Sequence, residues 1–177
     1  MLVRLTLLGL LIAVSGCATA PTLGTPIARL DPASGYRFEL SPNIHRRDDL
    51  LLAMSISGGG MRAAAFAHGV MRQLAAQPVR AGDRERPLLD ELDAISGVSG
   101  GAVTAAYFAL DPQRYFREFE SRFLRRDVTA EMWRALLNPV TLIRLMSRRY
   151  SRGDLYAEVL DRRLFDGATF ADLAARR

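Results

Sequence analysis

The residue best suited to chemistry in this chain is Ser99, which lies in the sequence Gly97-Val98-Ser99-Gly100-Gly101, a Gly-x-Ser-x-Gly pattern. A serine hydroxyl becomes a nucleophile when a neighbouring base takes its proton. Apolar residues precede the pattern and small residues follow it, which is the order of a strand, a sharp turn and a helix. We therefore predict that Ser99 is a nucleophile at the edge of a sheet, with Gly97 and Gly101 leaving room for strand and helix to approach.

A second candidate is the run Gly58-Gly59-Gly60, whose backbone N–H groups can point at one anion. A phosphate-binding P-loop would need Gly-Lys-Ser/Thr at its end, which is missing here. A dinucleotide-binding turn would need glycine where Ala63 stands and an acidic residue roughly 20 positions later, and Asp83 fits that poorly. An oxyanion hole for Ser99 fits best, because consecutive strand ends of a parallel sheet lie side by side.

These two turns need strands and helices to position them. Residues 50–57 are mostly apolar and predict a buried strand that ends at the glycines. After the glycines, Phe66, Val70 and Leu74 recur every fourth residue and predict the apolar face of a helix, with His68 mostly on the other side.

The spacing between the two turns predicts how their strands are joined. Gly60 and Ser99 are 39 positions apart (99 − 60), which accommodates one helix and a solvated loop over residues 78–87. The two strands are therefore expected to be parallel neighbours with a right-handed crossover. The helix after Ser99 is expected to stop at Asp111-Pro112.

The second half of the chain has helical patterns. Asn138-Pro139 predicts an N-cap followed by proline at the first helical position. A further helix is expected over residues 154–165. Four aromatic residues at helical spacing favour a packed core over a lipid-facing surface: Tyr115, Phe116, Phe119 and Phe123.

The sequence Ser57-Gly58-Gly59-Gly60-Met61-Arg62, followed by the Ser99 pattern, resembles the patatin-like phospholipase family from about residue 48 to the chain end. The resemblance implies a three-layer α/β fold with a mostly parallel sheet. It also implies that Ser99 is the nucleophile, that Gly58, Gly59 and Gly60 supply the oxyanion hole, and that no metal or cofactor takes part. Ala63 departs from the pattern, since many members have the last glycine of Gly-x-Gly-x-x-Gly there.

The base that would activate Ser99 is harder to find. Both histidines, His45 and His68, precede Ser99, whereas an ordinary Ser-Asp-His hydrolase has its histidine after the serine. The resemblance implies a Ser–Asp dyad with the aspartate in a later Asp-Gly-Gly/Ala motif. Asp166-Gly167-Ala168 matches those letters, but helical patterns flank it, so we interpret it as a helix end and keep Asp166 as the weaker candidate for the base. The catalytic aspartate and the rest of the sheet are therefore expected beyond Arg177.

The N-terminus predicts export. Residues 5–14 are almost entirely apolar and follow Arg4, which is typical of a signal-peptide core and too short to span a bilayer. Val14-Ser15-Gly16-Cys17 resembles the bacterial lipobox, so residues 1–17 are predicted to be a lipoprotein signal peptide with lipidation at Cys17. Ordinary cleavage after Ala20 is the alternative. Residues 18–47 are expected to be a tether and residues 48–177 the N-terminal part of the patatin-like domain, anchored on the periplasmic or outer-membrane side.

The net charge of the chain excludes few classes of function by itself. The chain has a formal net charge of +5 at pH 7, and all 24 of its basic residues are arginine, which a codon bias explains. A basic segment follows the Ser99 pattern and is either a solvated face or a surface for anionic head groups. It contains Arg122, Arg125, Arg126, Arg134, Arg144, Arg148, Arg149 and Arg152. Nucleic acid is not an expected partner of an exported, anchored protein.

Three functions follow from these observations. The first is a membrane-tethered serine acyl hydrolase of phospholipase A or esterase type, with a lipid acyl ester as substrate and no cofactor. The second is an acyltransferase on the same scaffold, which a product assay would distinguish. The third is a truncated, non-catalytic lipoprotein or binding module. A reading frame that continues past Arg177 into a strand ending in Asp-Gly-Gly or Asp-Gly-Ala would favour the enzymes.

Overall fold

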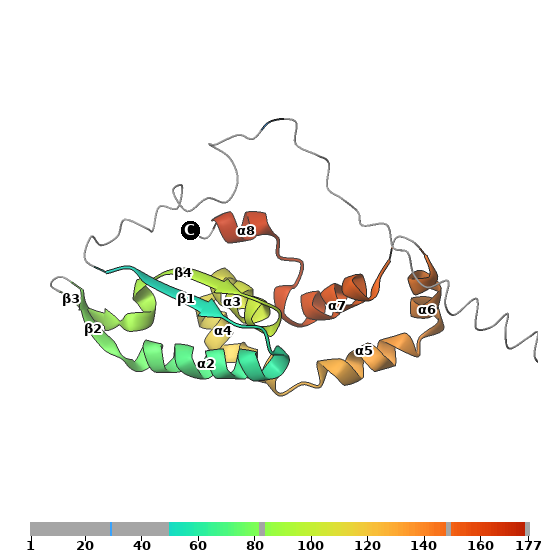
Figure 1. Ribbon diagram of the computed structural model, residues 1–177, viewed down its shortest axis with the longest axis horizontal. Coiled ribbons are helices and arrows are strands. Elements are labelled where there is room, and N and C mark those ends of the chain that lie inside the picture. Colours follow the sequence, from blue (N-terminus) through green and yellow to red (C-terminus); the bar gives the residue numbers. More distant parts are fainter. Residues whose placement is uncertain (1–28, 30–49, 82–83, 148–149, 176–177) are drawn as a thin grey trace, which may run out of the picture. The chain divides into compact units, whose positions relative to one another are not determined.

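The computed structural model describes residue 29 and residues 50–81, 84–147 and 150–175 (Figure 1). The chain divides into two compact units. The described part of one consists of residues 50–81, 84–126 and 161–175, and that of the other of residues 127–147 and 150–160, together with Arg29. The predicted signal peptide, Cys17 and, apart from Arg29, the predicted tether lie outside the described residues. No helix in the described ranges is long and apolar enough to cross a bilayer.

The larger unit is built on two parallel strands, β1 (Leu52–Ile56) and β4 (Leu92–Gly97), which are hydrogen-bonded neighbours (Figure 1). Each strand leads into a helix, α2 (Gly60–Ala76) after β1 and α3 (Gly100–Leu110) after β4. The predicted strand–turn–helix order at both glycine-rich turns is confirmed, and so is the parallel pairing of the strands. The protein thus has an α/β fold with a parallel sheet.

The core of this unit lies on one face of the two-stranded sheet. Ile56, Ala67 and Ala105 form a buried cluster, with Met54 and Ile95 packed against it. Because successive side chains of a strand point to opposite faces, the other face of β1 is exposed. The expectation of a strand buried throughout residues 50–57 therefore holds for one face only.

The predicted apolar face of α2 is wrong at Phe66, whereas Val70 and Leu74 are half-buried. Phe66 is 76% exposed, whereas Ala64, Ala67, His68 and Met71 are buried. Both sets recur with helical spacing, so periodicity alone does not choose between them. The alanines let α2 approach its neighbours closely, and α2 contacts α3 along this small-residue face. Tertiary packing therefore turns the small side chains inward and leaves Phe66 outside.

The predicted loop over residues 78–87 is a β-hairpin. Strands β2 (Pro78–Ala81) and β3 (Arg84–Pro87) pair antiparallel, with Arg80 opposite Glu85. Two residues connect the strands, which is the shortest common hairpin connection. The charged composition suggested a solvated loop, but opposite charges on paired strands are also compatible with a surface hairpin. A short helical turn, η2 (Leu88–Glu91), then leads into β4.

An aromatic cluster packs between α2, α3 and the helix that follows. Asp111 ends α3 and caps α4 (Pro112–Phe119), accepting a 2.9 Å hydrogen bond from the backbone N–H of Arg114. The chain continues as a π-helical turn, η3 (Glu120–Leu124). Tyr115, Phe119 and Phe123 are buried, so the predicted core role of the aromatic stripe is confirmed, as is the helix end at Asp111-Pro112.

His68 is enclosed by this aromatic cluster. Its side chain is 6% exposed, and its ring centroid lies 5.2 Å from that of Tyr115 and 5.8 Å from that of Phe119. Its Nδ1 atom has no hydrogen-bond partner. Burial lowers the pKa of His68 below 6.5, Arg72 lowers this pKa further, and Glu120 opposes both. His68 is therefore held neutral in the folded protein.

This environment predicts a pH-dependent stability. Below pH 6.5 the unfolded chain protonates His68 while the folded protein does not, so the free energy of unfolding falls as the pH drops toward the folded pKa. Replacing His68 with phenylalanine should flatten this slope in urea unfolding measured over the mildly acidic range. An unaltered slope in the His68→Phe variant would contradict the assignment.

The smaller unit is helical. It contains α5 (Val128–Leu136), α6 (Pro139–Met146) and α7 (Arg152–Leu160). Asn138 caps α6 by accepting a 2.9 Å hydrogen bond from the N–H of Val140, which confirms the predicted N-cap with proline after it. The helix predicted over residues 154–165 is also confirmed, since α7 is followed by a π-helical turn, η4 (Asp161–Phe165).

Two helical segments flank Asp166, as predicted from the sequence. The turn η4 precedes it, and α8 (Phe170–Ala175) follows it. Thr169 and Asp172 make reciprocal contacts at the start of α8. The Asp172 carboxylate accepts hydrogen bonds from the N–H and hydroxyl of Thr169 at 2.7 Å, and the Asp172 N–H donates to Thr169 Oγ1 at 3.4 Å. Asp166 therefore lies between two helices and does not end a strand.

Candidate active site

Ser99 occupies the turn between β4 and α3. Its backbone has φ +54° and ψ −121°, a left-handed conformation that is uncommon for any residue other than glycine. The turn is tight, because Gly101 N–H donates to Val98 O at 2.9 Å and Ala102 N–H donates to Ser99 O at 2.9 Å. The Ser99 side chain is exposed and makes no capping hydrogen bond to α3. Backbone strain of this kind is characteristic of residues held for function.

The glycines around Ser99 allow backbones to approach where no side chain fits. A Cβ on Gly97 would lie 2.3 Å from Gly101 O, and a Cβ on Gly101 would lie 2.6 Å from Ile56 O. These contacts join β4, α3 and the end of β1 at one point. Glycine is therefore required at positions 97 and 101 for strand and helix to pack this closely.

Gly100 is a residue of this site that sequence reasoning missed. A Cβ on Gly100 would lie only 2.2 Å from Gly60 O, so Gly100 is where the start of α3 touches the start of α2. The signal for it was the doubled glycine after Ser99, which a Gly-x-Ser-x-Gly pattern does not itself require. The two helices begin side by side because Gly100 lacks a side chain, whereas a Cβ on Gly60 would meet no atom within 4 Å.

The glycine loop over residues 58–60 lies beside Ser99. A Cβ on Gly58 would be 3.8 Å from Ser99 Cβ and 3.6 Å from Val98 Cγ1. Gly59 and Gly60 have φ values of +153° and +59°, which L side chains rarely adopt. Among the described residues, the N–H groups of Gly58 and Gly59 donate to no backbone acceptor. These two N–H groups thus have no backbone acceptor in the part of the loop that adjoins Ser99.

The electrostatics at this point favour negative charge. Helices α2 and α3 begin at Gly60 and Gly100, and the first N–H groups of a helix have no intrahelical acceptor. The helix dipole adds a partial positive charge at each N-terminus. A strained serine, unpaired glycine amides and two helix N-termini together form an arrangement able to stabilise an oxyanion on an acyl group attacked by Ser99.

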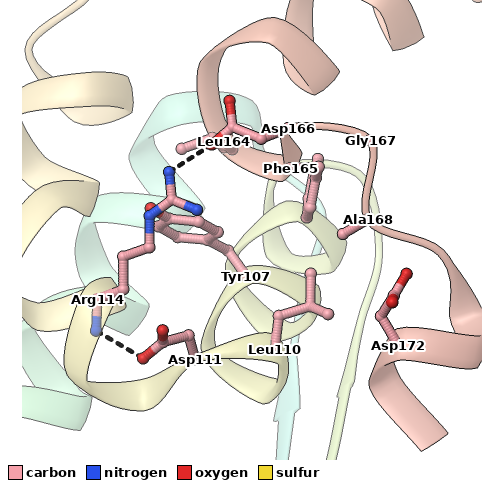
Figure 2. A pocket seen from close by; sticks show the side chains of 10 residues that line it. All are labelled: Tyr107, Leu110, Asp111, Arg114, Leu164, Phe165, Asp166, Gly167, Ala168 and Asp172. Carbon is pink, nitrogen blue, oxygen red and sulfur yellow. Dashed lines mark hydrogen bonds and ion pairs between the residues drawn. The ribbon is translucent and has the colours of Figure 1, made fainter. Parts of the chain in front are cut away.

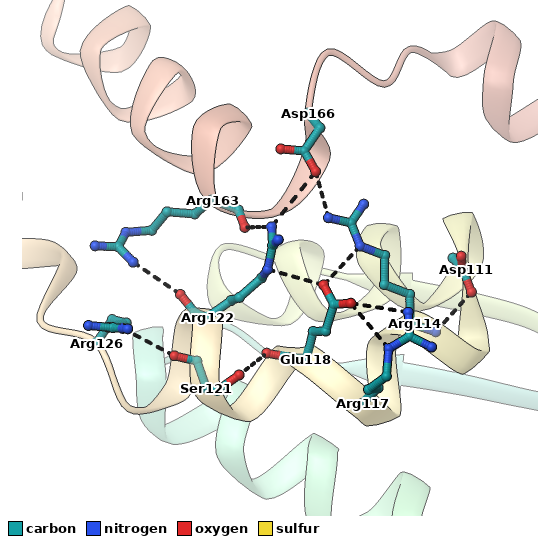
Figure 3. A network of polar contacts seen from close by, with 9 residues as sticks. All are labelled: Asp111, Arg114, Arg117, Glu118, Ser121, Arg122, Arg126, Arg163 and Asp166. Carbon is teal, nitrogen blue, oxygen red and sulfur yellow. Dashed lines mark hydrogen bonds and ion pairs between the residues drawn. The ribbon is translucent and has the colours of Figure 1, made fainter.

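Asp166 has different neighbours. Its carboxylate pairs with Arg114 at 2.5 Å and lies 3.7 Å from Arg122, and Glu118 joins both arginines (Figure 3). The hydrogen bond from Arg114 holds the pKa of Asp166 below its usual range. A carboxylate stabilised in its charged form by arginine is a weak base. The network therefore favours a structural role for Asp166.

Asp166 also lines a cavity of about 300 Å³ with Tyr107, Leu110 and Arg114 (Figure 2). Tyr107 and Leu110 belong to the C-terminal half of α3, whereas Ser99 precedes its first residue. Eight residues of helix correspond to roughly 12 Å along the axis. None of the residues lining this cavity comes from the Ser99 turn or the glycine loop. The structure thus brings Ser99 together with Gly58, and places Asp166 with the arginines of α4 and η3.

No group suited to holding a metal ion occurs in the described ranges, where three or more His, Cys, Asp or Glu side chains nowhere converge.

Comparison with known proteins adds one finding. A family model described as patatin-like phospholipase matches residues 54–177, which includes both glycine-rich turns. Neither the curated proteins nor the solved structures gave a significant match to the chain.

Proposed function

The chain belongs to the patatin-like phospholipase family, and we propose that it is a lipid acyl hydrolase whose nucleophile is Ser99. The observation that carries this proposal is the strained backbone of Ser99, whose φ is +54°, beside the glycine loop. The family supports a lipid ester as substrate. A serine held in this way has its hydroxyl free to attack an acyl carbon, since it makes no hydrogen bond that caps α3.

The reaction follows from the placement of these groups. Ser99 Oγ attacks the acyl carbonyl carbon and transfers its proton to a base, and the N–H groups of Gly58 and Gly59 stabilise the oxyanion that forms. The intermediate collapses, the base returns the proton to the leaving alcohol, and the acyl group stays on Ser99. Water then attacks the acyl-enzyme and releases a fatty acid. We assign the base to an aspartate other than Asp166, because arginines hold that carboxylate in its charged form.

The experiment that tests the hydrolase uses the protein expressed from its complete reading frame. It should release fatty acid from phospholipid vesicles and cleave a short-chain ester without added metal or cofactor. An acylated alcohol in place of free fatty acid would identify an acyltransferase. Absence of both products, together with no reaction with a fluorophosphonate, would overturn the proposal.

The glycine loop gives a prediction for the oxyanion hole. Alanine fits sterically at position 58, because a Cβ there meets its nearest atom at 3.6 Å. The added methyl group would displace an oxyanion beside Ser99, so we expect turnover to fall by about 10²-fold, the loss typical of a misplaced reacting group. Gly69→Ala, on open helix surface, is the matched control. Ester hydrolysis and urea unfolding are measured for both variants; full activity of a folded Gly58→Ala variant would exclude this role.

We also propose that the protein is an exported lipoprotein held at a membrane through lipidated Cys17. The support is the lipobox-like sequence Val14-Ser15-Gly16-Cys17 after an apolar run. The Cys17→Ser variant should fail to be processed, or should lose the firm, salt-resistant attachment to the membrane that two or three acyl chains give. Mass spectrometry of the mature N-terminus is the measurement. An unmodified mature N-terminus at Pro21 would show ordinary cleavage after Ala20 instead.

A further inference from the structure

Large apolar side chains are exposed on α5 and α6 of the smaller unit, within one short stretch of the chain. Trp133 is 65% exposed and Met146 is 86% exposed. None of the residues of α6 is buried, although most of that helix is apolar. We call these six side chains the α5–α6 apolar patch: Trp133, Leu137, Val140, Leu142, Ile143 and Met146.

The spacing of the patch places its members on common helix faces. Trp133 and Leu137 are four positions apart, so one lies above the other at the end of α5. Val140, Ile143 and Met146 are each three positions apart along α6, which contacts α5. Large apolar side chains that are exposed together on two neighbouring helices are a common mark of an interaction site.

The charged residues in the stretch of chain that holds the patch, between Glu131 and Asp154, are all positive. Residues 132–153 contain five arginines, at positions 134, 144, 148, 149 and 152, and no aspartate or glutamate. Arg134 and Arg152 are exposed. Arg144 pairs with Glu158 of α7 and lies 3.9 Å from the centre of the Tyr150 ring, which fastens α6 to its own unit. The patch thus lies in a stretch of chain whose charged residues are all arginine.

We propose that the α5–α6 apolar patch is a membrane-contact surface that lies in the interface of an anionic phospholipid bilayer. Helices that lie in an interface combine an apolar face with basic residues, which is the composition found here. The apolar side chains enter the acyl boundary, the arginines meet lipid phosphates, and Trp133 takes the interfacial depth that indole rings prefer. This contact does not depend on Ser99 chemistry, and it is separate from the proposed anchor at Cys17.

Trp133 is the only tryptophan of the chain, so its fluorescence reports on the patch alone. The experiment uses the 177-residue chain carrying Cys17→Ser, which removes acylation. Vesicles of phosphatidylcholine with phosphatidylglycerol should shift Trp133 emission to the blue, and lipids brominated on their acyl chains should quench it. Vesicles of phosphatidylcholine alone should do so more weakly, and added salt should reduce the effect with anionic vesicles.

Variants locate the contact. Leu137→Asp and Ile143→Asp change exposed side chains and should abolish most of the quenching while leaving the circular dichroism of the protein unchanged. Phe170→Asp is the matched control, because Phe170 of α8 is 90% exposed but lies in the other unit. In this variant the brominated lipids should quench Trp133 fluorescence as strongly as in the parent. Arg134→Gln should reduce the preference for anionic vesicles.

Three outcomes would overturn the proposal. The first is unquenched Trp133 in protein that sediments with vesicles, since the attachment would then come from another segment. The second is equal quenching by neutral and anionic vesicles. The third is an emission already shifted to the blue without lipid and dependent on protein concentration, which would show that a second copy covers the patch. These outcomes are measured as Trp133 emission and quenching in protein without patch substitutions, so they do not depend on the folding of any patch variant.

Discussion

The Ser99→Ala variant is expected to lose ester hydrolysis by about 10⁴-fold or more, as removal of a catalytic nucleophile does in other serine hydrolases. It should also lose all covalent labelling by a fluorophosphonate, because Ser99 is the nucleophilic side chain in the strained turn between β4 and α3. Alanine fits the position in size, and Ser99 makes no capping hydrogen bond, so the fold should survive. Labelling followed by mass spectrometry, in protein from the complete reading frame, measures the effect directly.

Asp166→Asn is the control for this experiment. Asparagine has the same shape and tolerates the left-handed backbone of Asp166, where φ is +50°. It removes a charge whose partners are Arg114 and Arg122, an exposed network of the kind that adds little to stability. Labelling and hydrolysis should stay near the parent values. Loss of both in a folded Asp166→Asn variant would identify Asp166 as the base and contradict our assignment.

The Gly100→Ala variant is expected to show the largest loss of stability. The new Cβ would lie 2.2 Å from the backbone oxygen of Gly60 and 3.0 Å from its Cα, so α2 and α3 would have to move apart. Overpacking typically costs 1–3 kcal/mol, and a clash with backbone rather than a flexible side chain places this variant at about 3 kcal/mol or more. Urea unfolding measures the change in the free energy of unfolding.

Gly69→Ala provides the matched control within α2. A Cβ at position 69 meets no atom within 4 Å, and alanine is the better helix former by about 1 kcal/mol. This variant should therefore be as stable as the parent or more so, while Gly100→Ala is strongly destabilised. Equal stability of the two variants would show that the starts of α2 and α3 do not touch at Gly60 and Gly100.

Local sequence patterns determined much of the site. The turns at residues 58–60 and 97–101 were predictable because a sharp turn from strand to helix needs positive φ values and close backbone approach, which glycine allows. The parallel pairing of β1 and β4 followed from the length of chain between the turns. The helix boundaries at Asp111-Pro112 and Asn138-Pro139 were also predictable, because a capping side chain and a proline act within a few residues of the boundary.

Tertiary structure decided which side of each element is used. Two faces of α2 have helical periodicity, and only the close approach to α3 selects the alanines and His68 over Phe66. The letters Asp-Gly-Ala do not say what surrounds Asp166, and its pairing with Arg114 joins residues 52 positions apart. The contact of Gly100 with Gly60 likewise joins two turns that no local pattern connects. In each case the decisive energy comes from groups distant in sequence, which periodicity and motif spacing do not contain.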